Sequence, residues 1–340
     1  MCPYYQPQQC TKLARPPYVC NGCVKKTNCM MNKRFYSSKY AEDEYRATLI
    51  SVREGINQTP ESIQRMNDLL TPLIRKGQSP AHIYATHAEE LGCSQRTLYE
   101  YISAGVFEVR NIDLRRAVKY KKRKKPTSCS AKDKSYRIGH NYSDFEERLK
   151  NNPPNNIVEM DCVEGKKSDR KVLLTMTFRK FNLILIFLLE SQTQEEVLRV
   201  LNWLESELGT ELFSRVFEVI LTNGGSEFAN REAIEKGKTG DNRTTVYYCD
   251  PYAFWQKGCC EKNHEYIRYV LPKKIISFEG LTQEKVTLLT NHINSTKRDS
   301  LNRHSPFELS QFLLDTRIHQ VLHLEAIDPD EVNLTPELMK

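Results

Sequence analysis

The order of apolar segments between residues 157 and 270 constrains the fold of this chain most strongly. Three short apolar stretches, at 157–163, 171–178 and 182–189, follow each other closely, and the second alternates apolar residues with a period of two. Such alternation is typical of β-strands, and the short connections predict an antiparallel meander. The pattern then predicts a helix at 193–208, a strand at 217–222, a short helix after Phe228, a strand near 246–248 and a helix at 256–270. We therefore predict an α/β domain with a mixed sheet flanked by helices.

Polar side chains stand where this order places the ends of elements. Asp161 lies near the end of the first strand, Asn223 follows the fourth strand, and Glu261 lies near the start of the last helix. Ribonuclease H-like enzymes share this element order and hold two Mg²⁺ or Mn²⁺ ions about 4 Å apart for phosphodiester chemistry. Asn223 offers only a neutral carbonyl oxygen, which predicts weak binding of the second ion. Glu227 and Asp250 are the nearby acids that could replace the missing carboxylate at position 223, although Glu227 is better placed to support its own loop.

The segment 79–102 has the pattern of two short helices joined by a turn. Ser79 and Pro80 start the first helix, and Ser94 caps the second one. A helix-turn-helix places its second helix in the major groove of DNA, so Gln95, Arg96 and Thr97 are predicted to contact bases; an ordinary helical hairpin is the alternative. Upstream, apolar residues three or four apart predict a helical pair over 42–76 with a turn at 55–57.

A basic run follows this segment. Residues 115–125 contain eight Lys or Arg and no acid, so without them the net charge of +7 would be slightly negative. Such a run attracts phosphates with an affinity that depends on salt, and a solvated linker is the alternative. The predicted DNA-contacting residues of the run are Arg115, Arg116, Lys119, Lys121, Lys122, Arg123, Lys124 and Lys125.

Cysteines are frequent and cluster near the start. The chain has 11 of them, an odd number that argues against a complete disulfide framework. Cys10, Cys20, Cys23 and Cys29 include one Cys-x-x-Cys pair, and four such thiolates predict a structural Zn²⁺ site. Reduced thiols that bind no metal are the alternative, and Cys2 is a possible substitute ligand.

Composition and these patterns together predict the domain order and location. The longest apolar runs, such as 183–189, are much shorter than the roughly 20 residues needed to span a bilayer, which predicts a cytoplasmic protein without membrane contact. The expected DNA binding would make it nucleoid-associated. The predicted parts are a cysteine-rich zinc-binding segment (1–37), a helical domain with the helix-turn-helix (38–114), a basic linker (115–153) with a short helix near 143–149, the α/β core (154–320) and a C-terminal tail (321–340). Tyr247, Tyr248 and Trp255 are expected to be buried in the core, and stacking on DNA bases is the alternative.

Several longer motifs cover nearly the whole chain. In the second half they are Glu159-Met160-Asp161-Cys162-Val163-Glu164-Gly165, Ile220-Leu221-Thr222 leading to Gly225-Ser226-Glu227-Phe228, Tyr248-Cys249-Asp250-Pro251-Tyr252, Trp255-Gln256-Lys257-Gly258, Glu261-Lys262-Asn263-His264, Leu271-Pro272-Lys273, Asn291-His292-Ile293-Asn294-Ser295 and Pro306-Phe307. In the first half they are Pro17-Tyr18-Val19-Cys20-Asn21-Gly22-Cys23, Gly55-Ile56-Asn57 and Arg110-Asn111-Ile112-Asp113-Leu114. In these motifs the chain resembles transposases of insertion-sequence family thirty, which are of the DDE type with an integrase-like, ribonuclease H-like core. The resemblance implies an enzyme that binds the inverted-repeat ends of its element in double-stranded DNA, cleaves there with Mg²⁺, and joins the 3′ hydroxyl to target DNA. It also implies that Asp161, position 223 and Glu261 are the three catalytic positions.

Two departures from the family qualify this expectation. Asn223 stands where the family has Asp, which predicts impaired strand transfer, and the chain opens directly in the cysteine-rich segment, which predicts a shortened or decayed copy. A non-catalytic DNA-binding regulator derived from a transposase is the alternative function. A structure-selective nuclease is a third reading, but it needs neither the zinc segment nor the helix-turn-helix. Transposition joins two element ends, so a homo-oligomer on DNA is expected.

Overall fold

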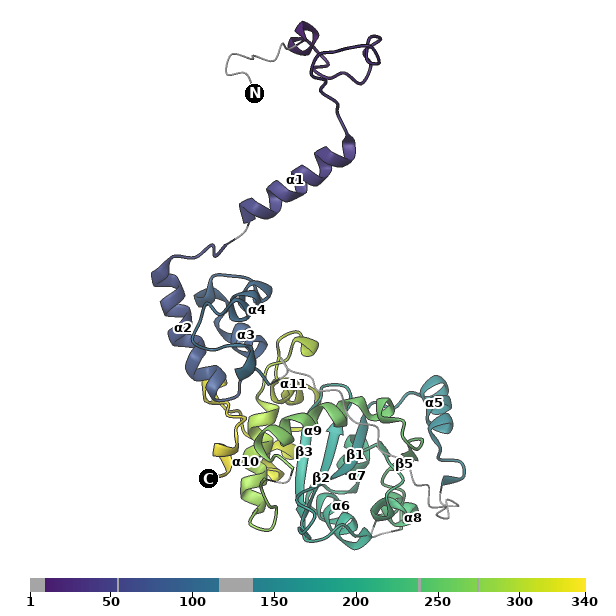
Figure 1. The fold of residues 1–340 in the computed structure, drawn as a ribbon. Coiled ribbons are helices and arrows are strands. Elements are labelled where there is room, and N and C mark those ends of the chain that lie inside the picture. The colour runs from purple at the N-terminus through teal and green to yellow at the C-terminus, as the bar shows by residue number, and fades with distance from the viewer. Residues whose placement is uncertain (1–9, 54, 116–136, 238–239, 274) are drawn as a thin grey trace. The chain divides into compact units, whose positions relative to one another are not determined.

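The computed structural model describes residues 10–53, 55–115, 137–237, 240–273 and 275–340 of the chain. The chain divides into two compact units, Met1–Thr59 and Pro60–Lys340, whose helices and strands are drawn in Figure 1. None of the described helices combines the length and the apolar character needed to cross a membrane.

The first unit holds the cysteine-rich segment and one long helix. A 3-10 turn, η1 (Thr11–Ala14), precedes a loop that Asn21 holds in place. The Asn21 side chain accepts a hydrogen bond from the Tyr36 backbone N–H (2.7 Å) and donates one to the Tyr36 carbonyl (2.9 Å). Helix α1 (Ser38–Arg53) follows, and the second helix of the expected pair is α2 (Pro60–Arg75), which belongs to the second unit.

The second unit begins with three helices around one small core. After α2 come α3 (Pro80–Leu91) and α4 (Gln95–Ala104), whose first turns are capped by the side chains of Ser79 and Ser94. Gly92 ends α3 in the left-handed conformation (φ 57°), which a glycine adopts without steric cost, and so permits the tight turn into α4. The shared core consists of Met66, Leu70, Leu73, Ile74, Ile83, Leu91, Leu98, Tyr101, Ile102, Phe107 and Val109. A short 3-10 turn, η2 (Asn111–Asp113), follows.

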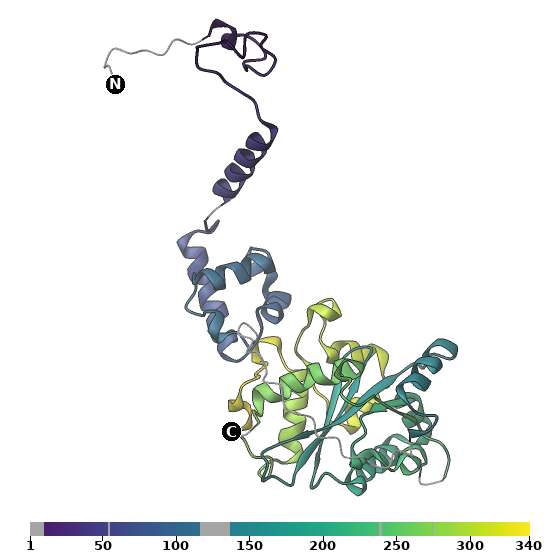
Figure 2. The same ribbon diagram turned by 45° about the vertical axis from the view of Figure 1, so that its right-hand side comes forward.

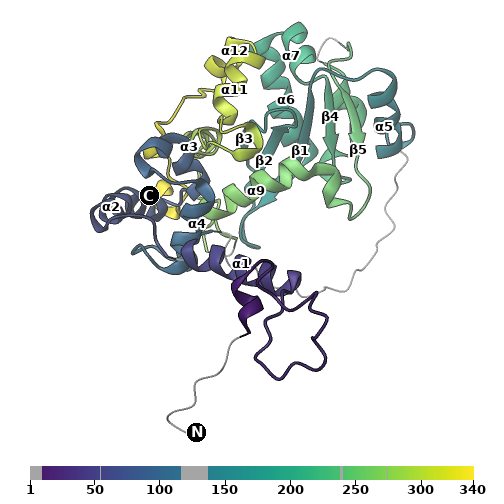
Figure 3. The same cartoon turned by 90° about the horizontal axis from the view of Figure 1, so that it is seen from above.

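A five-stranded mixed sheet forms the centre of the second unit. Its strands are β1 (Ile157–Glu164), β2 (Val172–Phe178), β3 (Ile184–Leu189), β4 (Val219–Thr222) and β5 (Thr245–Tyr248). Their order is β3-β2-β1-β4-β5, with the first three antiparallel and β1, β4 and β5 parallel (Figure 3). The predicted meander and the mixed α/β sheet flanked by helices are confirmed. β1 and β4 are parallel neighbours with Met160 opposite Thr222, so Asp161, inside β1 rather than at its end, lies beside residue 223 at the carboxyl end of β4.

Helices cover both faces of this sheet, as Figure 2 shows. One face packs on α6 (Gln194–Leu208), α7 (Thr210–Val216), α8 (Arg231–Glu235), α11 (Pro306–Leu313) and α12 (Thr316–Val321). The other face packs on α9 (Gly258–Val270) and α10 (Gln283–Asn294). The short 3-10 turns η4 (Ser226–Phe228), η5 (Phe254–Lys257) and η6 (Asp299–Leu301) connect these elements. Burial of all residues of β2 and β3 follows from this two-sided cover.

Two side-chain amides of α10 close the free edge of the sheet. Asn294 accepts a hydrogen bond from the Ile184 N–H (2.9 Å) and donates one to the Ile184 carbonyl (2.8 Å). Gln283 does the same for the Leu188 N–H (2.8 Å) and the Ile186 carbonyl (3.1 Å). These backbone N–H and carbonyl groups of the edge strand β3 are therefore hydrogen-bonded within the chain, so they are not available to pair with a strand of another molecule.

Part of the expected linker belongs to the packed core. Helix α5 (Tyr142–Asn151) lies within the range 115–153, yet its Phe145 is fully buried against Val219 and Leu221 of β4 and Tyr247 of β5. A short helix near 143–149 was predicted, but as part of a linker. Its burial was not predicted because its apolar residues, Tyr142, Phe145 and Leu149, are a weak signal among charged neighbours. Residues 116–136 of that range lie outside the described residues.

The C-terminal residues also pack, rather than forming a free tail. Val332 and Leu334, beside η7 (Pro329–Glu331) and η8 (Pro336–Met339), are buried with the α9–α10 face of the sheet. The buried amide of Gln78, just after α2, donates hydrogen bonds to the Pro329 carbonyl (2.9 Å) and the Val332 carbonyl (3.0 Å). This segment therefore joins the three-helix part to the α/β part of the second unit.

Candidate functional site

Asp161 is the centre of the candidate site. It lies on β1 opposite Thr175 of β2, and 15% of its side chain is exposed. Its Oδ1 accepts hydrogen bonds from the Cys162 backbone N–H (2.8 Å) and from the side-chain amide of Asn223 (2.8 Å). The carboxylate therefore faces the carboxyl end of β4, as the strand order requires.

The side-chain amide nitrogen of Asn223 faces Asp161. The Asn223 Oδ1 accepts a hydrogen bond from the Gly225 backbone N–H (2.8 Å), which leaves Nδ2 as the group that donates to Asp161. Both contacts agree with this orientation of the amide, because an oxygen turned toward the carboxylate would repel it. At this position the chain thus presents a hydrogen-bond donor, where a catalytic carboxylate would present a metal ligand.

Lys257 forms an ion pair with the other carboxylate oxygen of Asp161. Its Nζ lies 2.7 Å from Asp161 Oδ2, and the residue is only 5% exposed. Burial by itself lowers the pKa of Lys257, but the Asp161 carboxylate outweighs it and holds this pKa above the ordinary lysine value. A charged ammonium therefore neutralises Asp161. The sequence analysis missed this residue, because a lysine between two expected elements is normally solvated.

Glu159 fixes the helix that crosses the site. It is 1% exposed, and its Oε2 accepts the backbone N–H of Cys260 in the first turn of α9 (2.8 Å). Its Oε1 accepts from Arg179 Nε (2.8 Å), and Arg179 Nη2 donates to the Gln256 carbonyl (2.7 Å). A carboxylate at a helix N-terminus satisfies an unpaired N–H and the helix dipole. The signal for this role was an acid two residues before Asp161, on the same face of the strand and within its apolar first half.

The remaining acids lie in different surroundings. Glu261 is an exposed residue of α9, whose residues buried toward the sheet are Cys260, Asn263, Ile267 and Val270. Glu227 is buried, and its Oε1 accepts a hydrogen bond from Gln192 (2.9 Å). Asp250 is exposed and accepts from Gln256 Nε2 (2.8 Å). The structure thus brings position 223 to Asp161 and places Glu261 on the exposed side of its helix.

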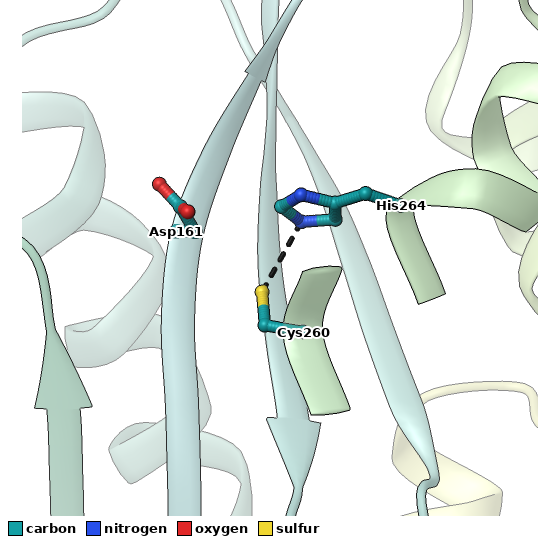
Figure 4. Close-up of side chains that lie close together, drawn as sticks. All are labelled: Asp161, Cys260 and His264. Atoms are coloured by element: carbon teal, nitrogen blue, oxygen red, sulfur yellow. Dashed lines mark hydrogen bonds between the residues drawn. The ribbon is translucent and has the colours of Figure 1, made fainter. Parts of the chain in front are cut away.

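Cys260 and His264 complete the immediate surroundings of Asp161. They are one turn apart on α9, with Sγ and Nε2 separated by 3.2 Å, and the Thr175 hydroxyl lies 2.8 Å from the same ring nitrogen. A carboxylate oxygen of Asp161 and these two atoms all lie within 4.8 Å of one another (Figure 4). Burial lowers the pKa of His264 to about 4 and raises that of the Cys260 thiol, so the ring is neutral and the thiol protonated near pH 7.

The aromatic residues near the site do not all lie where the sequence suggested. Tyr247 and Tyr248 are buried as expected, whereas Trp255 is 79% exposed. Trp255 lies in the turn η5, whose inward positions are taken by the buried Gln256 and Lys257. The expectation for Trp255 was wrong because these two polar residues point inward to bond with Asp250 and Asp161.

The residues expected to bind DNA are placed as follows. Arg96 is exposed on α4 and pairs with Glu100 (3.0 Å), while Thr97 contacts the capping Ser94. Gln95 donates to Asp299 (2.9 Å) in η6. Arg115 donates to the Leu334 carbonyl (2.7 Å) and lies over the Tyr269 ring. The remaining residues of the basic run lie outside the described part of the chain: Arg116, Lys119, Lys121, Lys122, Arg123, Lys124 and Lys125.

The four N-terminal cysteines line one cavity. This cavity has a volume of about 380 Å³, and Cys10, Cys20, Cys23 and Cys29 are all free and partly buried around it. Within the described residues, no three of their sulfurs form a group as close as the one at Asp161. The Zn²⁺ site remains a prediction.

Comparison with known proteins adds an independent observation. No protein-family model matches the chain. It is 36% identical over 85 residues to the transposase of insertion sequence element IS1086 of Cupriavidus metallidurans, covering 25% of this chain and 24% of that protein. It is 25% identical over 236 residues to a probable transposase of IS1161 of Streptococcus salivarius (67% and 61% covered), and 26% identical over 151 residues to that of IS30C of Escherichia coli (44% and 37%). The chain resembles insertion-sequence transposases.

These transposases are matched only in part, since the chain spans 24%, 61% and 37% of their respective lengths. Among solved structures, the catalytic core domain of BIV integrase is similar with a TM-score of 0.33 and 16% identity, covering 46% of this chain and 93% of that one.

Proposed function

We propose that this chain is a DNA transposase by descent that binds the ends of its element, and that Asn223 impairs its cutting of DNA. One observation carries the proposal: the side chain that follows the fourth strand lies 2.8 Å from the carboxylate of the first expected catalytic acid. The similarity to insertion-sequence transposases supports DNA as the substrate.

The metal expected for such an enzyme does not fit the residues present. Mg²⁺ prefers oxygen ligands, and two ions need several carboxylates. Around Asp161 the chain offers an amide N–H from Asn223 and an ammonium from Lys257, while Glu261 is exposed. We therefore infer that Mg²⁺ or Mn²⁺ binds weakly in the chain as written.

DNA binding is assigned to the N-terminal half. Arg96, exposed near the start of α4, is suited to reach a base edge, and the basic run is suited to phosphates. Gln95 and Arg115 hold contacts within the protein, so they contribute less. We further propose that a structural Zn²⁺ orders the cysteine-rich segment, and that two copies assemble on DNA because two ends must be joined.

The test compares cleavage of element ends by the chain and by its Asn223→Asp variant in Mg²⁺. We expect both to bind the ends, and the parent to cut them slower by ~10²-fold or more, equivalent to losing about 3 kcal/mol of transition-state stabilisation. In the Asn223→Asp background, Asp161→Ala and Glu261→Ala should abolish cutting and leave DNA affinity nearly unchanged. Equal cutting by parent and variant would mean that another acid, such as Glu227 or Asp250, supplies the missing ligand.

A second function, a non-catalytic regulator, is favoured by the Lys257–Asp161 ion pair, which satisfies the centre without metal. Such a protein occupies element ends without cutting them. Adding the parent chain to the Asn223→Asp variant should then lower cutting in proportion to the share of parent copies. If cutting is unchanged when the parent is in excess, the regulatory function is refuted.

A further inference from the structure

We propose that Asp161, Cys260 and His264 form a binding site for a borderline transition-metal ion such as Zn²⁺. This proposal is independent of the proposed function, because it concerns metal binding in the absence of DNA. Three kinds of donor meet here: a carboxylate oxygen, a cysteine sulfur and a histidine nitrogen, all within 4.8 Å of one another.

The donor set decides which metal the site takes. Sulfur and imidazole nitrogen are ligands for Zn²⁺, Co²⁺ and similar ions, whereas Mg²⁺ requires oxygen. Two of the three donors are therefore unsuited to the metal of a DDE enzyme. A site with three protein ligands also leaves one tetrahedral position open, as in catalytic zinc sites.

The geometry is close to that of a tetrahedral site. Bonds of about 2.0–2.3 Å to a central ion separate neighbouring ligand atoms by roughly 3.3–3.8 Å. Cys260 Sγ and His264 Nε2 are already 3.2 Å apart, because residues four apart on a helix lie on the same side. The Asp161 oxygen lies within 4.8 Å of both atoms, so it has to move by at most about 1–1.5 Å, which a side-chain rotation provides.

The surroundings hold these ligands in place. Glu159 fixes the start of α9 by accepting the Cys260 N–H (2.8 Å), and Thr175 contacts both His264 (2.8 Å) and Cys260 (3.7 Å). Lys257 is the competing cation, since its Nζ lies 2.7 Å from Asp161 Oδ2. The Thr175 hydroxyl donates to the Asp161 carbonyl (3.0 Å) and therefore accepts from His264 Nε2–H. Binding of the ion thus releases the thiol proton of Cys260 to solvent, moves the ring proton of His264 to Nδ1 and displaces the ammonium from that oxygen.

Cobalt binding to the full, reduced, metal-free chain tests the proposal. Co²⁺ replaces Zn²⁺ and gives thiolate-to-cobalt charge transfer together with tetrahedral ligand-field bands. The N-terminal cysteines form a second possible site, so the measurement is the loss of one equivalent of Co²⁺ in the Cys260→Ser and His264→Gln variants relative to the parent. Cys259→Ser is the matched control, because that sulfur faces the Arg179 carbonyl (3.7 Å) and not Asp161.

We expect Cys260→Ser and His264→Gln each to bind one equivalent of Co²⁺ fewer than the parent, and Cys259→Ser to bind as much as the parent. Excess Mg²⁺ should not displace this equivalent of Co²⁺. Circular dichroism establishes that each variant is folded, and His264→Gln decides the matter if Cys260→Ser does not fold. Lys257→Met should bind Co²⁺ more tightly than the parent. Equal stoichiometry and superimposable spectra for parent and His264→Gln, or weaker binding by Lys257→Met, would overturn the proposal.

Discussion

Replacing Asn223 by Asp should make the stability of this protein depend on a divalent cation. The Asn223 oxygen bonds to the Gly225 N–H, so a carboxylate in the same conformation places its second oxygen where Nδ2 now donates to Asp161 at 2.8 Å. A stabilising hydrogen bond to a charged group, about 1.5–3 kcal/mol, becomes a contact between two negative charges.

The magnitude follows from the geometry. If the two carboxylates relax to about 4 Å apart, their repulsion is about 4 kcal/mol at an effective dielectric constant of about 20. Lys257, 2.7 Å from Asp161, offsets part of it. We therefore expect a net loss of about 3 kcal/mol, which lowers Tm by roughly 5–10 °C in a protein of this size.

The assay is thermal unfolding in a chelator and then in Mg²⁺. An ion held between the two carboxylates at 100 times its Kd restores about 2.7 kcal/mol, so Mg²⁺ should recover most of the lost Tm. Asn223→Ala is the control: it loses the same hydrogen bonds without adding charge and should not respond to Mg²⁺. If Asn223→Asp unfolds like the parent in chelator and ignores Mg²⁺, then position 223 does not face Asp161 as described.

Three further outcomes are expected. In the full chain, Cys20→Ser should lower bound Zn²⁺ by one equivalent if the N-terminal thiols form a site, and unchanged zinc would count against it. Arg96→Ala should relax the sequence preference of DNA binding by ~1–3 kcal/mol at one base pair. Neutralising residues 121–125 should weaken binding to all DNA sequences and flatten its salt dependence. The control Arg199→Ala, which removes an equally local ion pair, should change neither the preference nor the affinity. Glu159→Gln should destabilise the fold by about 3–5 kcal/mol, because Arg179 is left without its partner; a loss under 1 kcal/mol in urea unfolding would contradict that role.

Much of the fold could be predicted from patterns that act locally. Alternating apolar residues marked β2, and the side chains of Ser79 and Ser94 marked the starts of α3 and α4, because strands and helix caps are determined by neighbouring residues. A short helix near 143–149 was predicted, but the packing of helix α5 into the core was not, since that packing depends on one aromatic ring meeting strands far along the chain. Burial of the C-terminal residues depends on such distant contacts as well.

The backbone positions of the site residues could be predicted from the sequence, but the charged groups that contact Asp161 could not. The strand order alone brings residues 161 and 223 together, and that expectation needed no side-chain detail. The positions of Lys257 and Cys260 depend on how α9 is rotated about its axis, which Glu159 fixes through a contact between residues about a hundred positions apart. A helical period gives the spacing of side chains on a helix but not which of them faces a given strand end.

Charge balance explains why Asn223 and Lys257 belong together. Three carboxylates at one edge of a sheet repel each other and are stable only around cations, so a chain with all three depends on metal. Here Asp161 has one positive partner, Lys257, and one neutral donor, Asn223, and both of its oxygens are satisfied by the protein. The resulting centre is neutral without any ion. Such a neutral centre attracts Mg²⁺ only weakly. An ion that also bonds strongly to the sulfur of Cys260 and the nitrogen of His264 gains enough binding free energy to displace the ammonium.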